Sequence, residues 1–175
     1  MDGAHMKETG PIAVHTISVI VDNEAGVLAR VIGLFSGRGY NIESLTVSTV
    51  DTSHETSRIT IVTSGTRMVI EQIKAQLDRL VPVHKVADLT IEGDFVSRDL
   101  ALVKVAGVGE KRVEALRLAE AFRAQVVDAS RDSFVFELTG AANKLDAFVD
   151  LMSELGLVEV ARTGAVALAR GQQGL

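Results

Sequence analysis

The amino-acid sequence predicts an α+β protein that contains two βαββαβ units in tandem. Two observations predict this class. Segments with strand-like alternation and segments with helix-like spacing follow one another in the same order twice. The apolar residues, 47% of the 175 positions, are nearly all aliphatic, with one Tyr and no Trp. Such a composition is typical of β-branched strands that pack against helices.

The first half begins with a predicted strand at 14–21, which alternates and is rich in β-branched residues. A polar turn at 22–26 follows this strand. Apolar residues then recur at helical spacing, namely Val27, Leu28, Val31, Leu34 and Phe35. Gly37 and Gly39 predict the end of that helix, because glycine readily adopts the left-handed conformation that closes many helices.

The first half continues with two predicted strands, 41–51 and 58–64, which the polar stretch 52–57 joins as a loose hairpin. A second amphipathic helix is predicted by apolar residues at helical spacing: Ile70, Ile73, Leu77 and Leu80. Pro82 lies just past the predicted end of this helix, which fits because proline cannot continue a helix. A last strand is predicted at 83–91.

The second half repeats this order after a short Gly-Asp connection. Its strands are predicted at 100–106, 125–129, 134–139 and 158–169. Its helices are predicted by two apolar stripes: Ala115, Leu118, Ala119 and Phe122, then Leu145, Phe148, Val149, Met152 and Leu155. The two halves share little residue identity, so the repeat is one of architecture.

The predicted domain ranges are 13–92 and 96–171. Each is expected to form a ferredoxin-like, four-stranded antiparallel sheet with both helices on one face. Residues 1–12 are predicted to be a cloning remnant and a disordered start, because tag removal and cloning often leave the run Gly-Ala-His-Met. The run MDGAHM also lacks the charged and apolar regions of a signal peptide. The uncovered sheet faces and open edges favour dimerisation.

Charge and composition exclude several classes of function. The formal net charge is −5 without any Lys/Arg cluster, which argues against a nucleic-acid partner. The chain has no cysteine, which excludes disulfides and thiolate catalysis and favours a cytoplasmic location. No apolar run approaches the ~18 residues that a membrane helix needs, so no membrane partner is expected.

Patterns for catalysis and metal binding are weak. His15, His54 and His84 have no partner at ligand spacing, so they are predicted to be structural or surface residues. No G-x-S-x-G motif is present. Residues 107–112 follow a strand and open a helix but lack the spacing of a phosphate-binding loop, so a tight turn with solvated charges is expected there.

The turn between the first strand and the first helix is the strongest candidate site. The helix is expected to begin near Gly26, where unpaired N–H groups and the positive dipole end can receive a carboxylate. Gly26 has no Cβ, so a ligand can approach the backbone closely. Asn23 can accept from an ammonium or donate to a carboxylate, and Val27 and Leu28 supply an apolar wall. The combination matches a small aliphatic zwitterion, although an ordinary Asn/Gly helix cap explains the same residues.

A specific resemblance adds to this pattern. The run DNEAGVLARVIGLFSGRGYNIESLTV, residues 22–47, resembles the start of the ACT domain in the small regulatory subunit of acetolactate synthase, also called acetohydroxyacid synthase. The part RGYNIES, residues 38–44, separates this family from generic ACT domains. The similarity extends from Val14 to Gly171, with supporting stretches at 57–61, 71–77, 100–105, 144–148, 159–164 and 169–171.

The resemblance implies an N-terminal ACT domain, a C-terminal ferredoxin-like regulatory domain and no active site in this chain. It implies a partner, the large catalytic subunit, which carries thiamine diphosphate, magnesium and FAD. That transferase condenses pyruvate with pyruvate or 2-oxobutyrate in valine, leucine and isoleucine biosynthesis. The small subunit is expected to activate this partner, to form a homodimer through its ACT domains and to confer feedback inhibition by a branched-chain amino acid, foremost valine.

The effector site that the resemblance implies is shared between two copies of the chain. One copy contributes Asn23, Glu24, Ala25, Gly26, Val27 and Leu28, and the other contributes Asn41 and Ile42. Ala25 stands where many ACT domains carry proline, so the turn is less rigidly preset. Two other classes stay open: a free-standing amino-acid-binding ACT protein that serves another enzyme or a regulator, and an enzyme on a ferredoxin-like scaffold.

Overall fold

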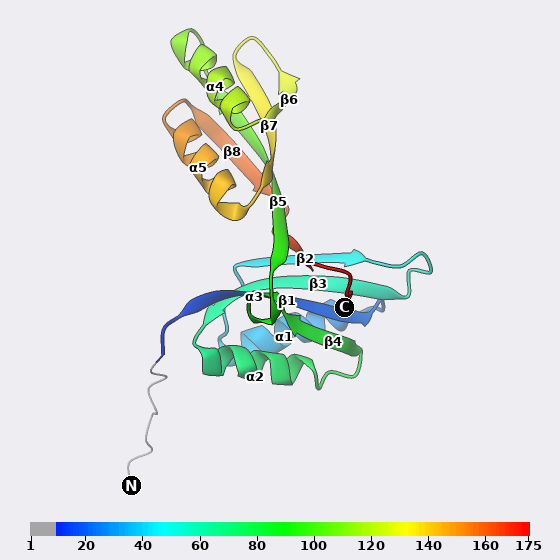
Figure 1. Ribbon diagram of the computed structural model, residues 1–175. Helices are drawn as coiled ribbons and strands as arrows, with labels where there is room; N and C mark the ends of the chain where they lie inside the picture. The colour runs from blue at the N-terminus through cyan, green and yellow to red at the C-terminus, as the bar shows by residue number, and fades with distance from the viewer. Residues whose placement is uncertain (1–9) are drawn as a thin grey trace. The chain divides into compact units, whose positions relative to one another are not determined.

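The chain folds into two compact units, shown in Figure 1. The computed structural model describes residues 10–175, so the start predicted at 1–12 lies outside the described residues except for positions 10–12. The first unit extends to Val96 and also contains Ala167–Leu175, and the second unit is Ser97–Val166.

Four strands form the sheet of the first unit, in the order β2-β3-β1-β4 with antiparallel neighbours (Figure 1). The elements of this unit are β1 (Ala13–Asp22), α1 (Val27–Arg38), β2 (Ser44–Thr49), β3 (Thr56–Gly65), α2 (Arg67–Leu77), β4 (Val83–Asp88) and α3 (Leu89–Glu92). The central strand β1 pairs with β3 along its whole length, from Ala13 opposite Gly65 to Asp22 opposite Thr56.

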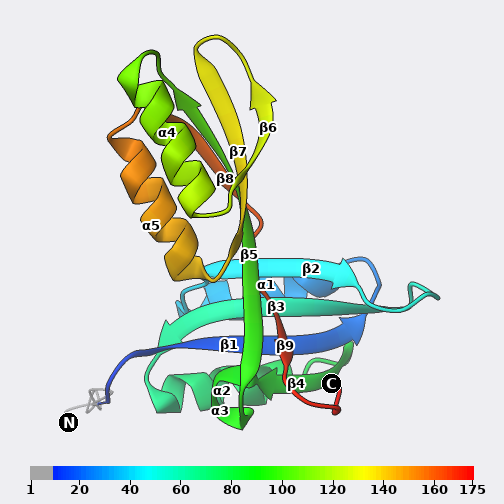
Figure 2. The ribbon, with the colours of Figure 1, turned by 45° about the horizontal axis from the view of Figure 1, so that its top comes forward.

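Helices α1 and α2 both lie on one face of this sheet (Figure 2). Alternate residues of β1, namely Ile17, Val19 and Val21, are buried against them, as the period-two alternation of a strand requires. They pack on one stripe of each helix: Val27, Val31 and Phe35 of α1, and Ile70, Ile73 and Leu77 of α2. The core therefore fixes the direction in which α1 leaves the sheet.

The last strand of the first half is shorter than the predicted range 83–91. Strand β4 ends at Asp88, and the short helix α3 follows. The Asp88 side chain accepts a hydrogen bond from Thr90 N (3.0 Å), and the Glu92 side chain accepts one from Asp88 N (2.9 Å). This reciprocal capping begins a helix where apolar alternation alone predicted more strand.

The second unit confirms the predicted α+β class, because it repeats the βαββαβ order. Its elements are β5 (Phe95–Ala106), α4 (Glu110–Ala121), β6 (Gln125–Ala129), β7 (Ser133–Gly140), α5 (Ala142–Ser153) and β8 (Leu157–Arg162). Strand β9 (Val166–Ala169) follows, and its residues from Ala167 onward belong to the first unit. The strand order is β6-β7-β5-β8, and β9 pairs with β5. Val103, Phe136 and Phe148 are fully buried between this sheet and its helices.

The predicted closing strand, 158–169, is in fact two strands, β8 and β9. The strand is interrupted at Gly164, whose φ of 86° lies in the left-handed region that glycine adopts without strain. The Asp99 carboxylate holds this break, because it accepts hydrogen bonds from Thr163 Oγ1 (3.0 Å) and Gly164 N (3.1 Å). Apolar residues alternate on both sides of this interruption, so the sequence pattern did not predict two strands.

Arg162 binds the same carboxylate. Its Nε and Nη2 donate to Asp99 Oδ2 (3.0 and 2.7 Å), and its Nη1 donates to Asp146 Oδ1 (2.6 Å). Desolvation lowers the pKa of Arg162, but the hydrogen bonds to Asp146 and Asp99 outweigh it and raise the pKa above its ordinary value. The Asp99 side chain is 7% exposed and that of Asp146 is 60% exposed, so Asp99 contributes more to stability.

The C-terminal segment Ala167–Leu175 packs with the first unit. It joins a small apolar cluster of Ala87, Leu89, Phe95, Ala167 and Leu175. Arg58 Nη1 also donates to Ala167 O (3.4 Å). The predicted range 96–171 assigned positions 167–171 to the second domain, because apolar alternation does not show which sheet a segment covers.

We predict that Asp99→Ala lowers the free energy of unfolding of the second unit by about 1–3 kcal/mol, because it leaves Arg162 and Thr163 without their buried acceptor. Asp146→Ala is the matched control. It removes an exposed partner of the same arginine and should lower that free energy by less than about 1 kcal/mol. Urea denaturation followed by circular dichroism measures both, and equal losses would contradict the assignment.

Candidate functional site

The turn between β1 and α1 has the open backbone that the sequence predicts. Gly26 occupies the N-cap position with φ 88° and ψ −8°, a left-handed conformation that favours glycine. A Cβ placed there would meet no atom within 4 Å. Glu24 and Ala25 are exposed beside it. Nothing among the described residues therefore blocks a ligand from the backbone at Gly26.

The start of α1 offers unpaired N–H groups. The hydrogen bond from Arg30 N to Gly26 O (3.0 Å) begins the helix, and no side chain of the described residues caps it. The N–H groups of Leu28 and Ala29 consequently have no acceptor within the helix. Together with the helix dipole, such a start attracts a carboxylate.

Asn23 is held by the loop that joins β2 and β3. Its Nδ2 donates to His54 O (2.7 Å), and its backbone N donates to Glu55 O (2.7 Å). Because a carbonyl oxygen only accepts, the side-chain atom that faces His54 is the amide nitrogen. The amide oxygen Oδ1 is then the side-chain atom that does not face His54. Asn23 therefore offers an acceptor, which suits an ammonium group.

Asp51 closes the loop that holds Asn23. Its Oδ2 accepts hydrogen bonds from Thr56 N (3.1 Å) and Thr56 Oγ1 (2.7 Å). The Thr56 hydroxyl is the main cause that lowers the pKa of Asp51, with desolvation opposing it and a bond from Ser53 adding to it. His54 adopts φ 59° within the loop, which few non-glycine residues do. Sequence reasoning missed this arrangement, whose visible signal was Asp and Thr at the two ends of a short polar segment.

Val27 and Leu28 do not form one apolar wall, and that prediction is corrected. Val27 is 4% exposed and belongs to the core with Val31 and Phe35. Leu28 is 36% exposed, and Ile32, one helical turn later, is 39% exposed. Leu28 and Ile32 therefore form the exposed apolar stripe beside the site, and Val27 fixes the helix start to the sheet.

Asn41 and Ile42 lie at the opposite end of the sheet from Asn23. Asn41 O accepts a hydrogen bond from Thr63 Oγ1 (2.5 Å), and Thr63 pairs with His15 near the start of β1. Asn23 follows the end of β1, so the two ends are separated by the seven residue steps from position 15 to position 22, about 23 Å at the rise of a strand. One chain does not bring the two predicted sets of residues together.

The histidines that lie on β1 and β4 each contact a carboxylate. His15 Nδ1 is 2.7 Å from Asp88 Oδ2 in a buried contact, and His84 Nε2 is 2.5 Å from Asp22 Oδ1 near the surface. Both contacts join β1 to β4. In residues 10–175 no group of three His, Cys, Asp or Glu side chains could hold a metal ion. No helix in this part of the chain is long and apolar enough to cross a membrane.

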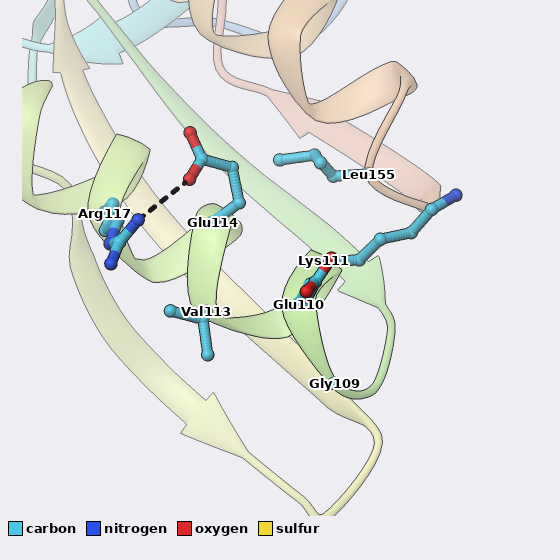
Figure 3. A pocket seen from close by; sticks show the side chains of 7 residues that line it. All are labelled: Gly109, Glu110, Lys111, Val113, Glu114, Arg117 and Leu155. Atoms are coloured by element: carbon cyan, nitrogen blue, oxygen red, sulfur yellow. Dashed lines mark ion pairs between the residues drawn. The ribbon is translucent and has the colours of Figure 1, made fainter.

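A hollow of about 750 Å³ lies beside the start of α4 (Figure 3). It is lined by Gly109, Glu110, Lys111, Val113, Glu114, Arg117 and Leu155, and Glu114 pairs with Arg117 (3.7 Å). This lining contains no Ser, Thr or Cys. Arg112 nearby is not solvated as predicted for the turn at 107–112, because its guanidinium lies 3.7 Å from the centre of the Phe134 ring and donates to Ser130 O (2.8 Å). That arginine ties α4 to the β6–β7 hairpin.

Known protein families match both units of the chain. Residues 17–85 match the family described as the AHAS small subunit-like ACT domain. Residues 98–171 match the family described as the small subunit of acetolactate synthase. The first match contains the candidate turn and most of the sheet that carries it.

Individual relatives extend over nearly the whole chain. The probable acetolactate synthase small subunit of Archaeoglobus fulgidus is 50% identical, over 91% of this chain and 98% of its own length. The acetolactate synthase isozyme 3 small subunit of Escherichia coli is 46% identical, over 90% of this chain and 96% of its own length. The crystal structure of the acetolactate synthase small subunit from Thermotoga maritima has a TM-score of 0.83 and 38% identity, over 92% of this chain and 99% of that chain.

Proposed function

The chain belongs to the family of acetolactate synthase small subunits. We propose that it is the regulatory subunit of acetolactate synthase and acts on a separate catalytic subunit. The match of both units to that family is the observation that carries the proposal. In this proposal the catalytic subunit holds thiamine diphosphate, magnesium and FAD, and this chain raises its activity. It also makes the enzyme sensitive to a branched-chain amino acid, foremost valine.

The effector binds at the β1–α1 turn in a defined orientation. The bare start of α1 at Gly26 receives its carboxylate. Asn23 Oδ1, turned away from the β2–β3 loop, accepts a hydrogen bond from its ammonium group. Leu28 contacts its aliphatic side chain. This orientation gives both charged ends of a zwitterion a hydrogen-bonding partner without any Lys or Arg.

Two copies of the chain complete the site. Asn23 and Asn41 lie at opposite ends of the sheet. Asn23 of one copy therefore meets Asn41 of the other where the two sheets run in opposite directions. Strand β2 is at the edge of the sheet, and a two-fold axis beside it places the start of one β2 next to the end of the other. Asn41 and Ile42 of one copy then approach Gly26 of the other, which gives two equivalent sites.

The same edge carries exposed apolar side chains that a second copy would cover. Leu28 and Ile32 form a stripe on α1, and Val47 of β2 is exposed as well. Val47 lies opposite the core residue Ile59 in the register of β2 and β3, so its side chain is on the face that α1 covers. Burial of this edge between two copies removes apolar surface from water.

We predict that adding this chain to its catalytic subunit raises the rate of acetolactate formation. One or more of valine, leucine and isoleucine should then inhibit the mixture and leave the catalytic subunit alone unaffected. Inhibition requires that the effector bind one dimer arrangement better than another, because equal affinity shifts nothing; couplings of about 1–3 kcal/mol are typical. A rate that does not change on mixing would refute the proposed function.

We predict that Gly26→Asp abolishes inhibition and preserves activation. Its carboxylate repels that of the effector, whereas its Cβ meets no atom within 4 Å and Asp tolerates a positive φ better than most residues. Gly26→Asn, of similar size and without charge, is the matched control and should bind valine more tightly than Gly26→Asp. Titration calorimetry with valine compares them, and an unchanged affinity in Gly26→Asp would contradict the proposed carboxylate position.

We predict that Ile32→Asp weakens dimerisation by at least about tenfold and weakens valine binding with it, because the charge must be buried at the shared edge. Val81→Asp is the control, since Val81 is exposed before β4, at the opposite edge of the sheet. Sedimentation equilibrium measures the dimer dissociation constant. Equal constants for the two variants would place the interface elsewhere.

A further inference from the structure

A series of hydrogen bonds links Asp51 to the candidate effector site. Asp51 Oδ2 accepts both the N–H and the hydroxyl of Thr56, which closes the loop between β2 and β3. The closed loop sets the direction of two consecutive carbonyls, those of His54 and Glu55. His54 O accepts a hydrogen bond from Asn23 Nδ2 (2.7 Å), and Glu55 O accepts one from the backbone N of Asn23 (2.7 Å).

We propose that Asp51 is a positioning residue for the effector, because the loop that it closes holds the Asn23 amide with Oδ1 turned toward the ligand. This inference rests on the proposed function and concerns the same site. The amide of an exposed asparagine otherwise rotates over a broad range of χ2. If the amide nitrogen faced the ligand, two hydrogen-bond donors, the amide N–H and the ammonium group, would oppose each other. Hydrogen bonds that hold the amide in advance reduce the entropy lost on binding.

The positioning role is separable from folding. Asp51 is partly exposed and His54 is exposed, whereas the core residues of β3, Ile59 and Ile61, are fully buried. Loss of the Asp51 carboxylate therefore loosens a surface loop and leaves the core intact. His54 also adopts φ 59° in this loop, a conformation that persists where its surroundings impose it.

Titration calorimetry with valine on the full chain tests the role. Asp51→Ala removes the acceptor for both Thr56 groups and should weaken valine binding by about three- to tenfold. Asp51→Asn keeps an oxygen that can accept from Thr56 and should bind within about twofold of the unchanged chain. Thr52→Ala, at an exposed position of the same loop, is the matched control and should bind as the unchanged chain does. The thermal midpoint should stay close to that of the unchanged chain in all three variants.

The side-chain amide signal of Asn23 in a nitrogen–proton correlation spectrum supplies a readout that does not depend on affinity. The signal is assigned by its absence in Asn23→Asp. It should move toward the position of a free amide in Asp51→Ala and stay in place in Asp51→Asn and Thr52→Ala. An unmoved signal, or an unchanged valine affinity in Asp51→Ala, overturns the positioning role.

The proposed effector site and the positioning role of Asp51 are refuted by different results. If the unchanged chain binds no branched-chain amino acid, the proposed effector site is wrong, and the Asn23 signal still decides whether Asp51 fixes the amide. If the unchanged chain binds valine and Asp51→Ala binds it equally well, the proposed function stands and the positioning role is wrong.

Discussion

A small amino acid cannot reach both ends of a β-sheet, and this constraint determines how the candidate site can work. Asn23 and Gly26 follow the end of β1, whereas Asn41 precedes β2 at the other end of the same sheet. In the dimer that we propose, a second copy related by a two-fold axis brings these groups together. Effector binding and subunit pairing then become linked equilibria, because a ligand held by both copies stabilises the pair.

Two kinds of structure hold the groups that we propose face the effector. The N–H groups at the start of α1 are fixed by the core, because Val27 packs with Val31 and Phe35 beneath the sheet. The Asn23 amide is instead fixed by a surface loop, which Asp51 closes with hydrogen bonds. A change in the core alters the whole unit, whereas a change in the loop alters the amide alone. The loop is therefore where affinity can be adjusted without loss of the fold.

Local patterns predicted most of the fold, since alternation in a strand and glycine at a helix end are visible within a few residues. They could not predict the contact between Asn23 and His54, which are 31 residues apart and meet only after β1 pairs with β3. The periodicity also did not show that Val27 is core and Leu28 is exposed, because an apolar stripe is wide enough to include both. The break in the predicted strand at 158–169 was hidden in the same way, by a contact with a distant carboxylate.

The chain passes between its two units twice, which bears on how an effector could act on a partner. It leaves the first unit after Val96 and returns at Ala167, so the second unit is an insertion in the sequence of the first. The return is fixed within the first unit by the apolar cluster around Ala87 and by the hydrogen bond from Arg58 to Ala167. Two covalent connections therefore join the first unit to the second, and a change in the first unit can reach the second through either. A regulator whose effector binds in one unit can use both connections.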